Sequence, residues 1–505
     1  MTQLRALMIQ GTSSDAGKSL LCTGLCRIFQ EDGVRVAPFK SQNMALNSYI
    51  TRDGGEIGRA QGVQAEACGV EATVDMNPIL LKPKAEMSSE VIVHGKHFAD
   101  LDAYSYRNEY VPLMIPKIQE SIDRLAQQYD LLVVEGAGSP AEINLKDRDI
   151  ANMRIADMLD CPVLLVADIE RGGVFASLVG TLELLEPHER ARVKGFLINK
   201  FRGRKELLDS GLQWLEERTG IPVLGVIPHF DHGIDPEDSL ALETLRLKAR
   251  DRADADLDIA VIKLPRISNF TDVAPLQEEP GVNVRFVSSA RALGKPDLIL
   301  LPGSKNTVDD LLWLQQTGLA EAILARQAAV VGICGGFQML GDVLHDPDGV
   351  ESVHPQVAGL GLLPLETTFL AEKKTVRNRG RLLAASFQEH EVEGYEIHLG
   401  RTERRAGSAF LQFESGEEDG AVSADGRVFG TYLHGLFQNR AFTRDFLNSL
   451  RVQKGFAPLT GEIETESERR EKSYAALAAH LRRHVDVERM YRIIGGTACL
   501  GLSER

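Results

Sequence analysis

Several features that define other classes of protein are scarce in these 505 residues. No stretch approaches the about 18 consecutive apolar residues that a membrane-spanning helix requires. The opening residues, MTQLRALMIQG, have too short an apolar core for a signal peptide. Basic residues are outnumbered, because 57 Lys and Arg against 72 Asp and Glu leave a net charge of −15. A broad surface for nucleic acid or anionic lipid is therefore disfavoured, and we expect a cytoplasmic protein with neither nucleic-acid nor membrane partners.

Cysteine is also rare, with six residues in the whole chain. The six form no CxxC pair and none of the spacings of zinc sites, so neither a disulfide framework nor a structural metal is predicted. Hydrophobic residues make up 43% of the chain, which is ample for several folded cores. Its length suggests about three domains. We expect five of the cysteines to be small buried side chains, with Cys334 as the exception.

A glycine-bearing loop, GTSSDAGKS, occupies Gly11 to Ser19 between an apolar run and a helix-like segment. A strand, a turn and a helix N-terminus direct backbone N–H groups and the positive end of a helix dipole at one small volume, which suits a phosphate. Lys18 would reach the outer phosphates, and the Ser19 hydroxyl would complete the shell of a Mg2+ ion. The loop is wider than the usual motif, because Thr12 stands where the first glycine is expected.

Short apolar strands alternate with amphipathic helical stretches, which predicts mostly parallel sheets covered on both faces. The expected strands of the first half are 4–9, 34–39, 131–135, 163–167, 195–199 and 223–227. Those of the second half are 258–263, 282–286, 297–301 and 328–333. The fold class is therefore α/β, with two doubly wound parallel-sheet domains. We place the domains at 1–235 and 257–450, joined by a polar linker at 236–256, with C-terminal helices at 451–505 that pack on the second domain.

Functional side chains of such sheets gather at the carboxyl ends of strands. Lys40 follows the second strand, beside the phosphate loop, where its charge can offset that of a transferring phosphoryl group. Glu135 ends a later strand and can hold a metal ion opposite the loop, whereas Glu56, in an isolated turn, is either a further ligand or simply solvated. Asn199 ends another strand, where its amide can read a purine base.

Cys334 lies in VVGICGGFQMLG, between an expected strand and an expected helix, with Gly332 and Gly335 near it. This pattern is typical of a nucleophile elbow, in which a tight turn exposes the thiol. The N-terminus of the following helix favours the thiolate form. Glycines on both sides would be a costly choice for a cysteine that only fills space, so we predict a nucleophile.

A cysteine nucleophile needs a base and donors for an oxyanion. His434, in FGTYLHGLF at another strand end, is the candidate base. The backbone N–H groups of Gly303 and Gly335 are the candidate oxyanion donors. Gln338, one turn after Cys334, could grip the amino acid that is cleaved.

With these residues the second half resembles the class I glutamine amidotransferases. In that family a thiolate attacks the side-chain amide of glutamine, forms a glutamyl thioester and releases ammonia, which implies Cys334 as nucleophile and His434 as base. The usual pattern has a glutamate two residues after the histidine, and this chain has Leu436 there. The third triad member is therefore missing or comes from elsewhere, with Glu396 in GYEIHLGRT as a candidate. This absence resembles the cobalamin-pathway branch of the family.

The first half resembles dethiobiotin synthetase and its relatives, which share the wide phosphate loop, the lysine after the second strand and the EGAG turn. Six segments together resemble the cobyric acid synthase family: QGTSSDAGKS, PFKSQNMALNS, GEIGRAQ, MNPILLKP, DIERGGVFAS and GYEIHLGRT. The resemblance implies ATP and Mg2+ as cofactors. The expected ATP contacts are Gly11, Thr12, Asp15, Gly17, Lys18, Ser19, Lys40 and Asn199, and the expected Mg2+ ligands are Ser19, Glu135 and Glu56.

The reaction implied by this resemblance belongs to cobalamin biosynthesis. ATP would phosphorylate a carboxylate of adenosylcobyrinic acid a,c-diamide, and ammonia released from glutamine would convert the acyl phosphate to an amide, at the b, d, e and g side chains in turn. Two alternatives stay open. One is a synthase that amidates the a and c side chains of cobyrinic acid, and the other is a P-loop regulatory ATPase, which would leave Cys334 and His434 without a function. The sequence allows a homo-oligomer.

Overall fold

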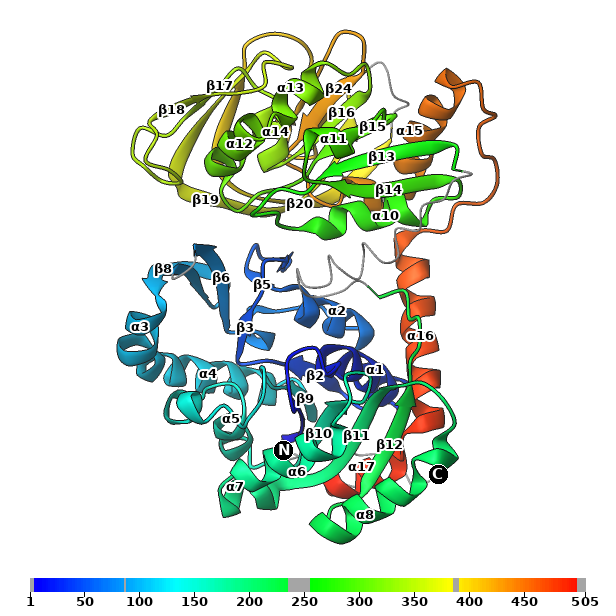
Figure 1. Ribbon diagram of the computed structural model, residues 1–505. Coiled ribbons are helices and arrows are strands. Elements are labelled where there is room, and N and C mark those ends of the chain that lie inside the picture. The colour runs from blue at the N-terminus through cyan, green and yellow to red at the C-terminus, as the bar shows by residue number, and fades with distance from the viewer. Residues whose placement is uncertain (1–3, 86–87, 235–254, 385–389, 497–505) are drawn as a thin grey trace. The chain divides into compact units, whose positions relative to one another are not determined.

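The computed structural model describes residues 4–85, 88–234, 255–384 and 390–496 (Figure 1). The chain divides into two compact units. Unit 1 consists of Met1–Ala45, Gly55–Ile234 and Arg470–Arg505, and unit 2 of Leu46–Gly54 and Asp235–Arg469. A short stretch of the first half thus belongs to unit 2. The predicted linker, 236–256, lies almost entirely outside the described residues.

Within the described residues, the main sheet of unit 1 has six parallel strands in the order β12-β11-β10-β1-β9-β2. Their bounds are β1 (Arg5–Gly11), β2 (Val36–Phe39), β9 (Leu131–Glu135), β10 (Val163–Asp168), β11 (Val193–Phe201) and β12 (Val223–Pro228). Each overlaps a predicted strand. They are nearly continuous apolar runs, because a parallel sheet is buried on both faces.

Helices cover both faces of this sheet, and β1 shows how its alternating side chains meet them. Leu7 and Ile9 share one hydrophobic core with α1 (Lys18–Glu31). On the opposite face the Gln10 amide lies 3.7 Å from the sulfur of Met153 in α5 (Met153–Met158). The other helices of unit 1 are α2 (Arg59–Ala67), α3 (Ala103–Ser105), α4 (Val111–Ala126), α6 (Val174–Leu184), α7 (Pro187–Arg192) and α8 (Asp209–Thr219), with short turns η1 (Val74–Met76), η2 (Tyr106–Tyr110), η3 (Ile143–Arg148) and η4 (Lys205–Leu207).

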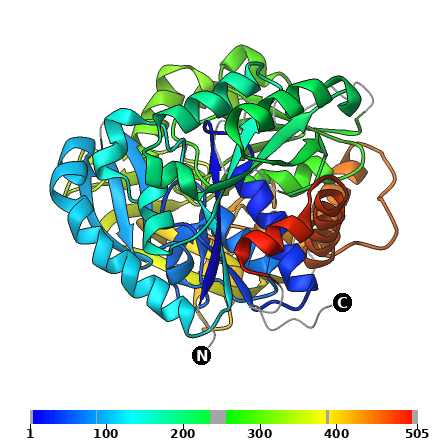
Figure 2. The ribbon, with the colours of Figure 1, turned by 90° about the horizontal axis from the view of Figure 1, so that it is seen from below.

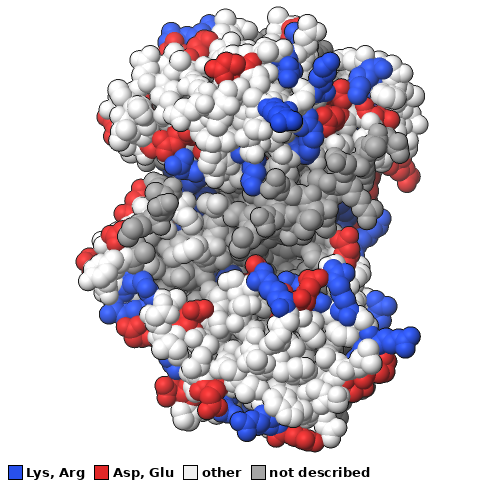
Figure 3. All heavy atoms as spheres, in the orientation of Figure 1, with Lys and Arg blue, Asp and Glu red and all other residues white. Residues whose placement is uncertain are grey.

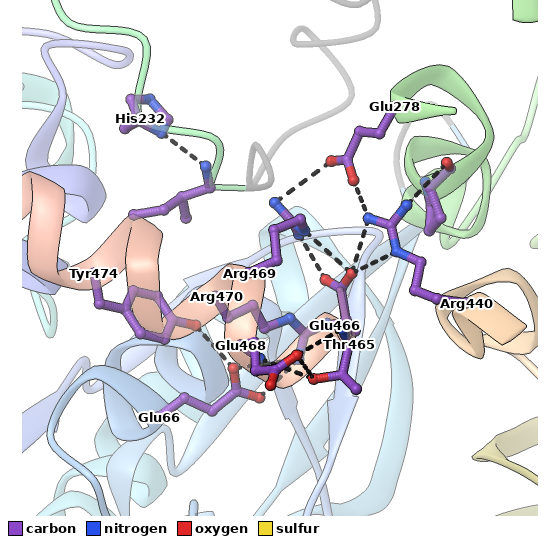
Figure 4. A network of polar contacts seen from close by, with 12 residues as sticks. Glu66, His232, Glu278, Arg440, Thr465, Glu466, Glu468, Arg469, Arg470 and Tyr474 are labelled. Atoms are coloured by element: carbon purple, nitrogen blue, oxygen red, sulfur yellow. Dashed lines mark hydrogen bonds and ion pairs between the residues drawn. The ribbon is translucent and has the colours of Figure 1, made fainter. Parts of the chain in front are cut away.

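The C-terminal helices α16 (Glu466–His484) and α17 (Val487–Ile494) correct one expectation, because from Arg470 onward they pack on unit 1 (Figure 2). A Cβ atom on Gly24 of α1 would lie 2.3 Å from Cδ1 of Leu481. Glu66 accepts hydrogen bonds from Tyr474 at 2.8 Å and Arg470 at 3.2 Å (Figure 4). The prediction that these helices pack on the second domain is therefore wrong, since an amphipathic pattern marks an apolar face and not its partner.

A second, smaller sheet of unit 1 has the order β3-β6-β7-β8 among the described strands. It consists of β3 (Gln42–Met44), β6 (Ile79–Ala85), β7 (Ser88–Val93) and β8 (Lys96–Asp102), and the last three pair antiparallel. A short strand β5 (Glu56–Gly58) precedes α2. This sheet was not predicted, because its strands lack the long apolar runs of the parallel sheet.

Unit 2 has a main sheet in the order β14-β13-β15-β16-β24-β23 within its described part. All neighbours are parallel except β23, which runs antiparallel to β24. The bounds are β13 (Leu257–Ile262), β14 (Val282–Val287), β15 (Leu298–Leu301), β16 (Ala329–Ile333), β23 (Ala421–Val422) and β24 (Val428–Thr431). The first four overlap the predicted strands, so the predicted α/β class with two parallel-sheet domains is confirmed.

A further sheet of unit 2 contains two long antiparallel strands, β19 (Leu365–Leu382) and β20 (Glu391–Arg404). Around them lie β17 (Val343–His345), β18 (Gln356–Ala358), β21 (Leu411–Phe413) and β22 (Glu418–Asp419), and β4 (Ser48–Ile50) contacts β19. The helices are α10 (Ala274–Glu278), α11 (Ala290–Leu293), α12 (Thr307–Gln316), α13 (Leu319–Leu324), α14 (Gly335–Met339) and α15 (Arg440–Gln453), with η5 (Phe270–Val273) and η6 (Leu436–Gln438).

The charged side chains of the surface and the burial of the cysteines complete the description of the fold. Basic and acidic side chains intermingle on the face drawn in Figure 3. The five cysteines within the described residues are all buried and form no disulfide with one another. Among the helices that the structure describes, none has the length and apolar character needed to cross a membrane.

Candidate active sites

Cys334 forms the turn between β16 and α14 of unit 2. Its backbone φ is 52° and its ψ −107°, a conformation that costs a non-glycine residue on the order of 1–3 kcal/mol. Two neighbouring glycines are needed because a side chain at either position would clash with the backbone. A Cβ on Gly336 would lie 2.0 Å from the carbonyl oxygen of Leu301. A Cβ on Gly332 would lie 2.6 Å from the carbonyl oxygen of Gly336. The strained turn presents the thiol at the carboxyl end of the sheet.

His434 follows β24 and is fully buried. Its Nδ1 atom lies 2.7 Å from Oδ2 of Asp272, whose other oxygen accepts the N–H of Gly435 at 2.8 Å. Burial alone would lower the pKa of His434, but the charge of Asp272 and the charge and hydrogen bond of Cys334 outweigh it and raise the pKa to about 10. The ring is therefore an imidazolium at neutral pH, the form that can give a proton to a leaving group.

Asp272, in η5, is the carboxylate that orients the imidazole. The structure places the candidate from the sequence, Glu396, against other partners: Nζ of Lys374 at 3.0 Å and Nδ2 of Asn378 at 2.7 Å. The suggestion of Glu396 is therefore corrected. Asp272 precedes the histidine by 162 positions. The signal that could have found it is its place in NFTDV, in the loop and short helix that follow β13.

Strand β20 supports both catalytic side chains from the other side. Tyr395 exchanges two backbone hydrogen bonds with His434, at 2.8 and 3.1 Å, and the two rings stack with centroids 5.1 Å apart. The sulfur of Cys334 lies 3.6 Å from the carbonyl oxygen of Ile397. Asn269, which precedes η5, has its Nδ2 atom 3.4 Å from Nε2 of the histidine. No local pattern in the sequence indicated any of these three supports.

The predicted oxyanion donors lie next to the same residues. A Cβ on Gly303 would lie 3.0 Å from Cε1 of His434, and one on Gly335 would lie 2.9 Å from the backbone nitrogen of Ser304. The N–H of Gly335 is the first of α14 and has no acceptor within its helix. Two backbone segments that approach the dyad this closely can offer N–H groups to one oxygen atom.

Gln338 is buried one turn behind Cys334. Its Oε1 atom accepts from the hydroxyl of Thr307 at 2.9 Å, and its Nε2 atom donates to the hydroxyl of Tyr432 at 3.1 Å. Thr402 lies 2.6 Å from that same hydroxyl. A contact between Gln338 and the amino acid that is cleaved stays a prediction, and Tyr432 and Thr307 join it as residues that the sequence reasoning missed.

The phosphate loop of unit 1 joins β1 to α1. Its φ angles are positive at Asp15 (59°) and at Gly17 (96°), so the backbone turns sharply and its N–H groups can converge on an anion. The Nζ atom of Lys18 donates to the carbonyl oxygens of Ser13 at 3.0 Å and Gly138 at 3.1 Å. The ammonium group thus connects the loop with the EGAG turn.

Glu135, at the end of β9, joins two other predicted site residues. Its Oε1 atom accepts from the Ser19 hydroxyl at 2.8 Å and from Nζ of Lys40 at 2.7 Å. Its Oε2 atom accepts from Nε2 of Gln64 at 2.6 Å, a contact that the sequence did not indicate. The described residues contain no cluster of three or more His, Cys, Asp or Glu that could hold a metal. The oxygens of Ser19 and Glu135 fit Mg2+, which commonly combines one or two protein oxygens with phosphate and water.

Three more predicted contacts of the nucleotide lie around the loop. The N–H of Thr12 donates to the carbonyl oxygen of Val166 at 2.9 Å, which ties the loop to β10. A Cβ on Gly11 would lie 2.9 Å from Nζ of Lys18. Asn199 donates from Nδ2 to the carbonyl oxygen of Ala16 at 2.9 Å. Asn199 therefore supports the loop, and its reading of a purine stays a prediction.

Glu56 lies in β5, where its Oε1 atom is 2.7 Å from Nζ of Lys82. Both side chains are almost fully buried, and a buried carboxylate is stable only when a cation or hydrogen bonds compensate for its desolvation. The ion pair accounts for the burial of Glu56. Its role as a Mg2+ ligand stays a prediction.

Comparison with known protein families matches a domain to each half of the chain. The model of the CobQ/CobB/MinD/ParA nucleotide binding domain matches residues 7–236, and that of the CobB/CobQ-like glutamine amidotransferase domain matches residues 258–442. The chain thus combines a glutamine amidotransferase domain with a P-loop nucleotide-binding domain.

Relatives similar to the whole chain narrow the class to one family. The cobyric acid synthase of Geobacillus thermodenitrificans is 52% identical over 499 residues, which cover 98% of this chain and 99% of the relative. That of Geobacillus kaustophilus is 51% identical over 504 residues, with 99% of each chain covered. That of Desulforamulus reducens is 52% identical over 511 residues, with 98% of this chain and 99% of the relative covered. The chain belongs to the cobyric acid synthase family.

Proposed function

We propose that the protein amidates the b, d, e and g carboxylates of adenosylcobyrinic acid a,c-diamide, with nitrogen from glutamine and activation by ATP. The observation that carries this proposal is the arrangement of Cys334, His434 and Asp272, which suits the release of ammonia from an amide. The phosphate loop in the same chain supplies the means to activate a carboxylate. Relatives named cobyric acid synthase that match nearly the full length support this substrate.

The glutaminase half of the reaction is assigned to unit 2, which holds Cys334 and His434. The thiolate of Cys334 attacks the side-chain carbonyl carbon of glutamine, and the N–H groups of Gly303 and Gly335 stabilise the oxyanion. The imidazolium of His434 gives a proton to the departing ammonia, while Asp272 holds the ring through Nδ1. The neutral imidazole then takes a proton from water, which hydrolyses the glutamyl thioester and restores the thiolate.

The synthetase half belongs to unit 1. The loop from Gly11 to Ser19 would hold the triphosphate of ATP through its N–H groups, and Lys18 would contact the outer phosphates. A carboxylate oxygen of the corrinoid attacks the γ-phosphorus, ADP leaves, and Lys40 offsets the charge of the transferring group. Ammonia then attacks the acyl phosphate and displaces phosphate, which leaves the amide. Mg2+ held by Ser19 and Glu135 would neutralise further phosphate charge.

The test is amidation by the purified full-length protein. We expect protein supplied with glutamine, ATP, Mg2+ and adenosylcobyrinic acid a,c-diamide to give four successive amide products in the mass spectrum. Cys334→Ser should abolish amidation with glutamine but keep amidation with ammonium salt, because the synthetase half needs only ammonia. The proposal fails if the wild-type protein hydrolyses glutamine and leaves the diamide unchanged.

The same assay separates the alternatives. A protein that amidates the a and c side chains would convert cobyrinic acid and ignore its diamide. A P-loop regulatory ATPase would hydrolyse ATP at a rate that neither glutamine nor Cys334→Ser changes. The buried Asp272–His434 pair argues against this last reading, because a regulatory ATPase has no use for an activated thiol.

A further inference from the structure

The stretch Leu46–Gly54 stands out because its contacts place it in unit 2, while the residues on either side of it belong to unit 1. It contains β4 and follows Lys40 by six residues in the sequence. We call it the inserted segment. Its partners in unit 2 include Asn269 and two residues of β19, Arg377 and Thr375. These residues adjoin the supports of the catalytic cysteine and histidine.

The first contact is made by Ser48, whose backbone N–H donates to Oδ1 of Asn269 at 3.2 Å. A backbone N–H can only donate, so it determines which end of the Asn269 amide faces it. The nitrogen end, Nδ2, must then face the other way, and it lies 3.4 Å from Nε2 of His434. The inserted segment therefore sets the orientation of an amide at the catalytic imidazole.

This orientation matters for proton transfer. An amide N–H can donate to Nε2 only when that nitrogen carries no proton, so it gives no hydrogen bond that would retain a proton there. The proton on Nε2 of the imidazolium is thus free to move to the leaving ammonia. The flipped amide would present its oxygen to Nε2–H, accept the proton's hydrogen bond and hold it away from the reaction.

The backbone of Asn269 suits this position. Its φ is 51° and its ψ 39°, the left-handed region that asparagine tolerates better than most residues. The side chain is buried, with 3% of its residue surface exposed. A buried side chain in a left-handed turn, with a partner at each end of its amide, has little freedom to take other orientations.

The second and third contacts reach β19. The guanidinium of Arg377 lies 5.0 Å from the ring centroid of Tyr49, and its nitrogen lies 3.3 Å from the Tyr49 hydroxyl. Arg377 pairs across the sheet with Tyr395, which stacks on His434. A Cβ on Gly54 would lie 3.2 Å from the carbonyl oxygen of Thr375.

The residue that pairs with Thr375 across the sheet supports the catalytic cysteine. Thr375 pairs with Ile397, whose carbonyl oxygen is the one that lies 3.6 Å from the sulfur of Cys334. The inserted segment therefore rests on the same positions of β19 that lie opposite the two supports in β20. One segment thus contacts the neighbours of both catalytic side chains.

We propose that Asn269 is a positioning residue for His434, and that the inserted segment Leu46–Gly54 keeps it in the productive orientation for glutamine hydrolysis. This inference rests on the proposed glutaminase function. Because the segment directly continues the Lys40 loop, a part of the nucleotide-binding half of the sequence is required for full activity of the amidotransferase half.

The test measures glutamine hydrolysis by full-length variants. Asn269→Gly removes the amide without straining the left-handed turn, and we expect kcat to fall about 10- to 100-fold with KM changed less than about threefold. Asn269→Asp keeps the shape but adds a charge that retains the proton, so we expect a lower kcat and a pH profile displaced upward by about one unit. Tyr49→Ala should lower kcat, and Tyr49→Phe should restore most of it.

Controls separate positioning from folding. Gly180→Ala, an exposed change in α6 of unit 1, should keep the wild-type kcat. All Asn269 and Tyr49 variants should keep ammonia-dependent amidation and the wild-type unfolding midpoint. The inference is overturned if folded Asn269→Gly hydrolyses glutamine within twofold of the wild type, or if Asn269→Asp leaves the pH profile in place. A wild-type protein that hydrolyses glutamine but does not amidate the corrinoid would sink the proposed function and leave this inference intact.

Discussion

Nδ1 of His434 lies 2.7 Å from Oδ2 of Asp272, and both side chains are buried. The position two residues after the histidine, where a glutamate is usual in this class, holds Leu436 and is buried as well. The carboxylate that orients the imidazole therefore comes from η5, in a different part of the chain. A carboxylate still pairs with the histidine, as in a Cys–His–carboxylate triad, although it does not have the usual spacing in the sequence.

Asp272→Asn should lower kcat for glutamine hydrolysis by about 10²- to 10⁴-fold, because an amide neither stabilises the imidazolium nor fixes its tautomer. Amidation with ammonium salt should stay near the wild-type rate. The measurement is glutamate release under steady-state conditions. Glu396→Gln is the comparison, and an equal loss in that variant would contradict the assignment of Asp272.

The pH dependence follows from the raised pKa of His434. Since that pKa is about 10 and the ordinary value is 6.5, the imidazolium that protonates ammonia persists at neutral pH, and kcat should fall as the pH rises through about 10. Asp272→Asn removes a neighbouring negative charge, which lowers the pKa of His434 and moves this limb to lower pH. Rate profiles of both proteins between about pH 6 and 11 test this shift.

The same pair contributes to stability with a definite sign. A pKa raised in the folded state adds stability that is fully present below about 6.5, the unfolded value, and is lost as the pH rises through about 10. The free energies of unfolding of wild type and Asp272→Asn, measured by chemical denaturation, should therefore differ most at about pH 6.5 and least above pH 10. An equal difference at both values would contradict the raised pKa.

Gly336→Ala should destabilise unit 2 by about 1–3 kcal/mol, because the added Cβ would meet the carbonyl oxygen of Leu301 at 2.0 Å. Gly180→Ala is the matched control: Gly180 is exposed within α6, and nothing lies within 4 Å of a Cβ there. Because alanine favours a helix more than glycine does, Gly180→Ala should raise the free energy of unfolding by about 0.5–1 kcal/mol. Thermal unfolding of both variants shows whether the destabilisation comes from the steric clash of the added Cβ or from the replacement of a glycine as such.

Glu135→Gln should reduce ATP-dependent amidation by at least about 100-fold even with ammonium salt, since it disrupts the carboxylate that Ser19 and Lys40 share. It should leave glutamine hydrolysis near the wild-type rate. Leaving Lys40 buried without its ion-pair partner also costs about 3–5 kcal/mol, so a stability control is needed. Asp75→Asn breaks the pair of Asp75 with Arg124 elsewhere in unit 1, and it should lower stability but keep the amidation rate at a temperature where the protein is folded.

The parallel strands of both units were predictable because buried strands are apolar runs bounded by turns, and β9 matched its predicted bounds. The sheet formed by β6, β7 and β8 escaped prediction, since none of its strands has more than three consecutive apolar residues. The C-terminal helices were placed on the wrong unit for a related reason. An apolar helix face shows that a partner exists, and only packing shows which one.

The sequence by itself determined the chemistry of this protein: a lysine and a serine in a phosphate loop, and a cysteine between glycines at a strand end, are recognisable because each depends on neighbours within a few residues. The tertiary structure decided which distant groups serve that chemistry, namely Asp272 and Asn269 at His434, and Gln64 at Glu135. These partners meet through sheet register and loop placement. A side-chain contact between residues 71 to 165 positions apart leaves no periodic or local pattern in the chain.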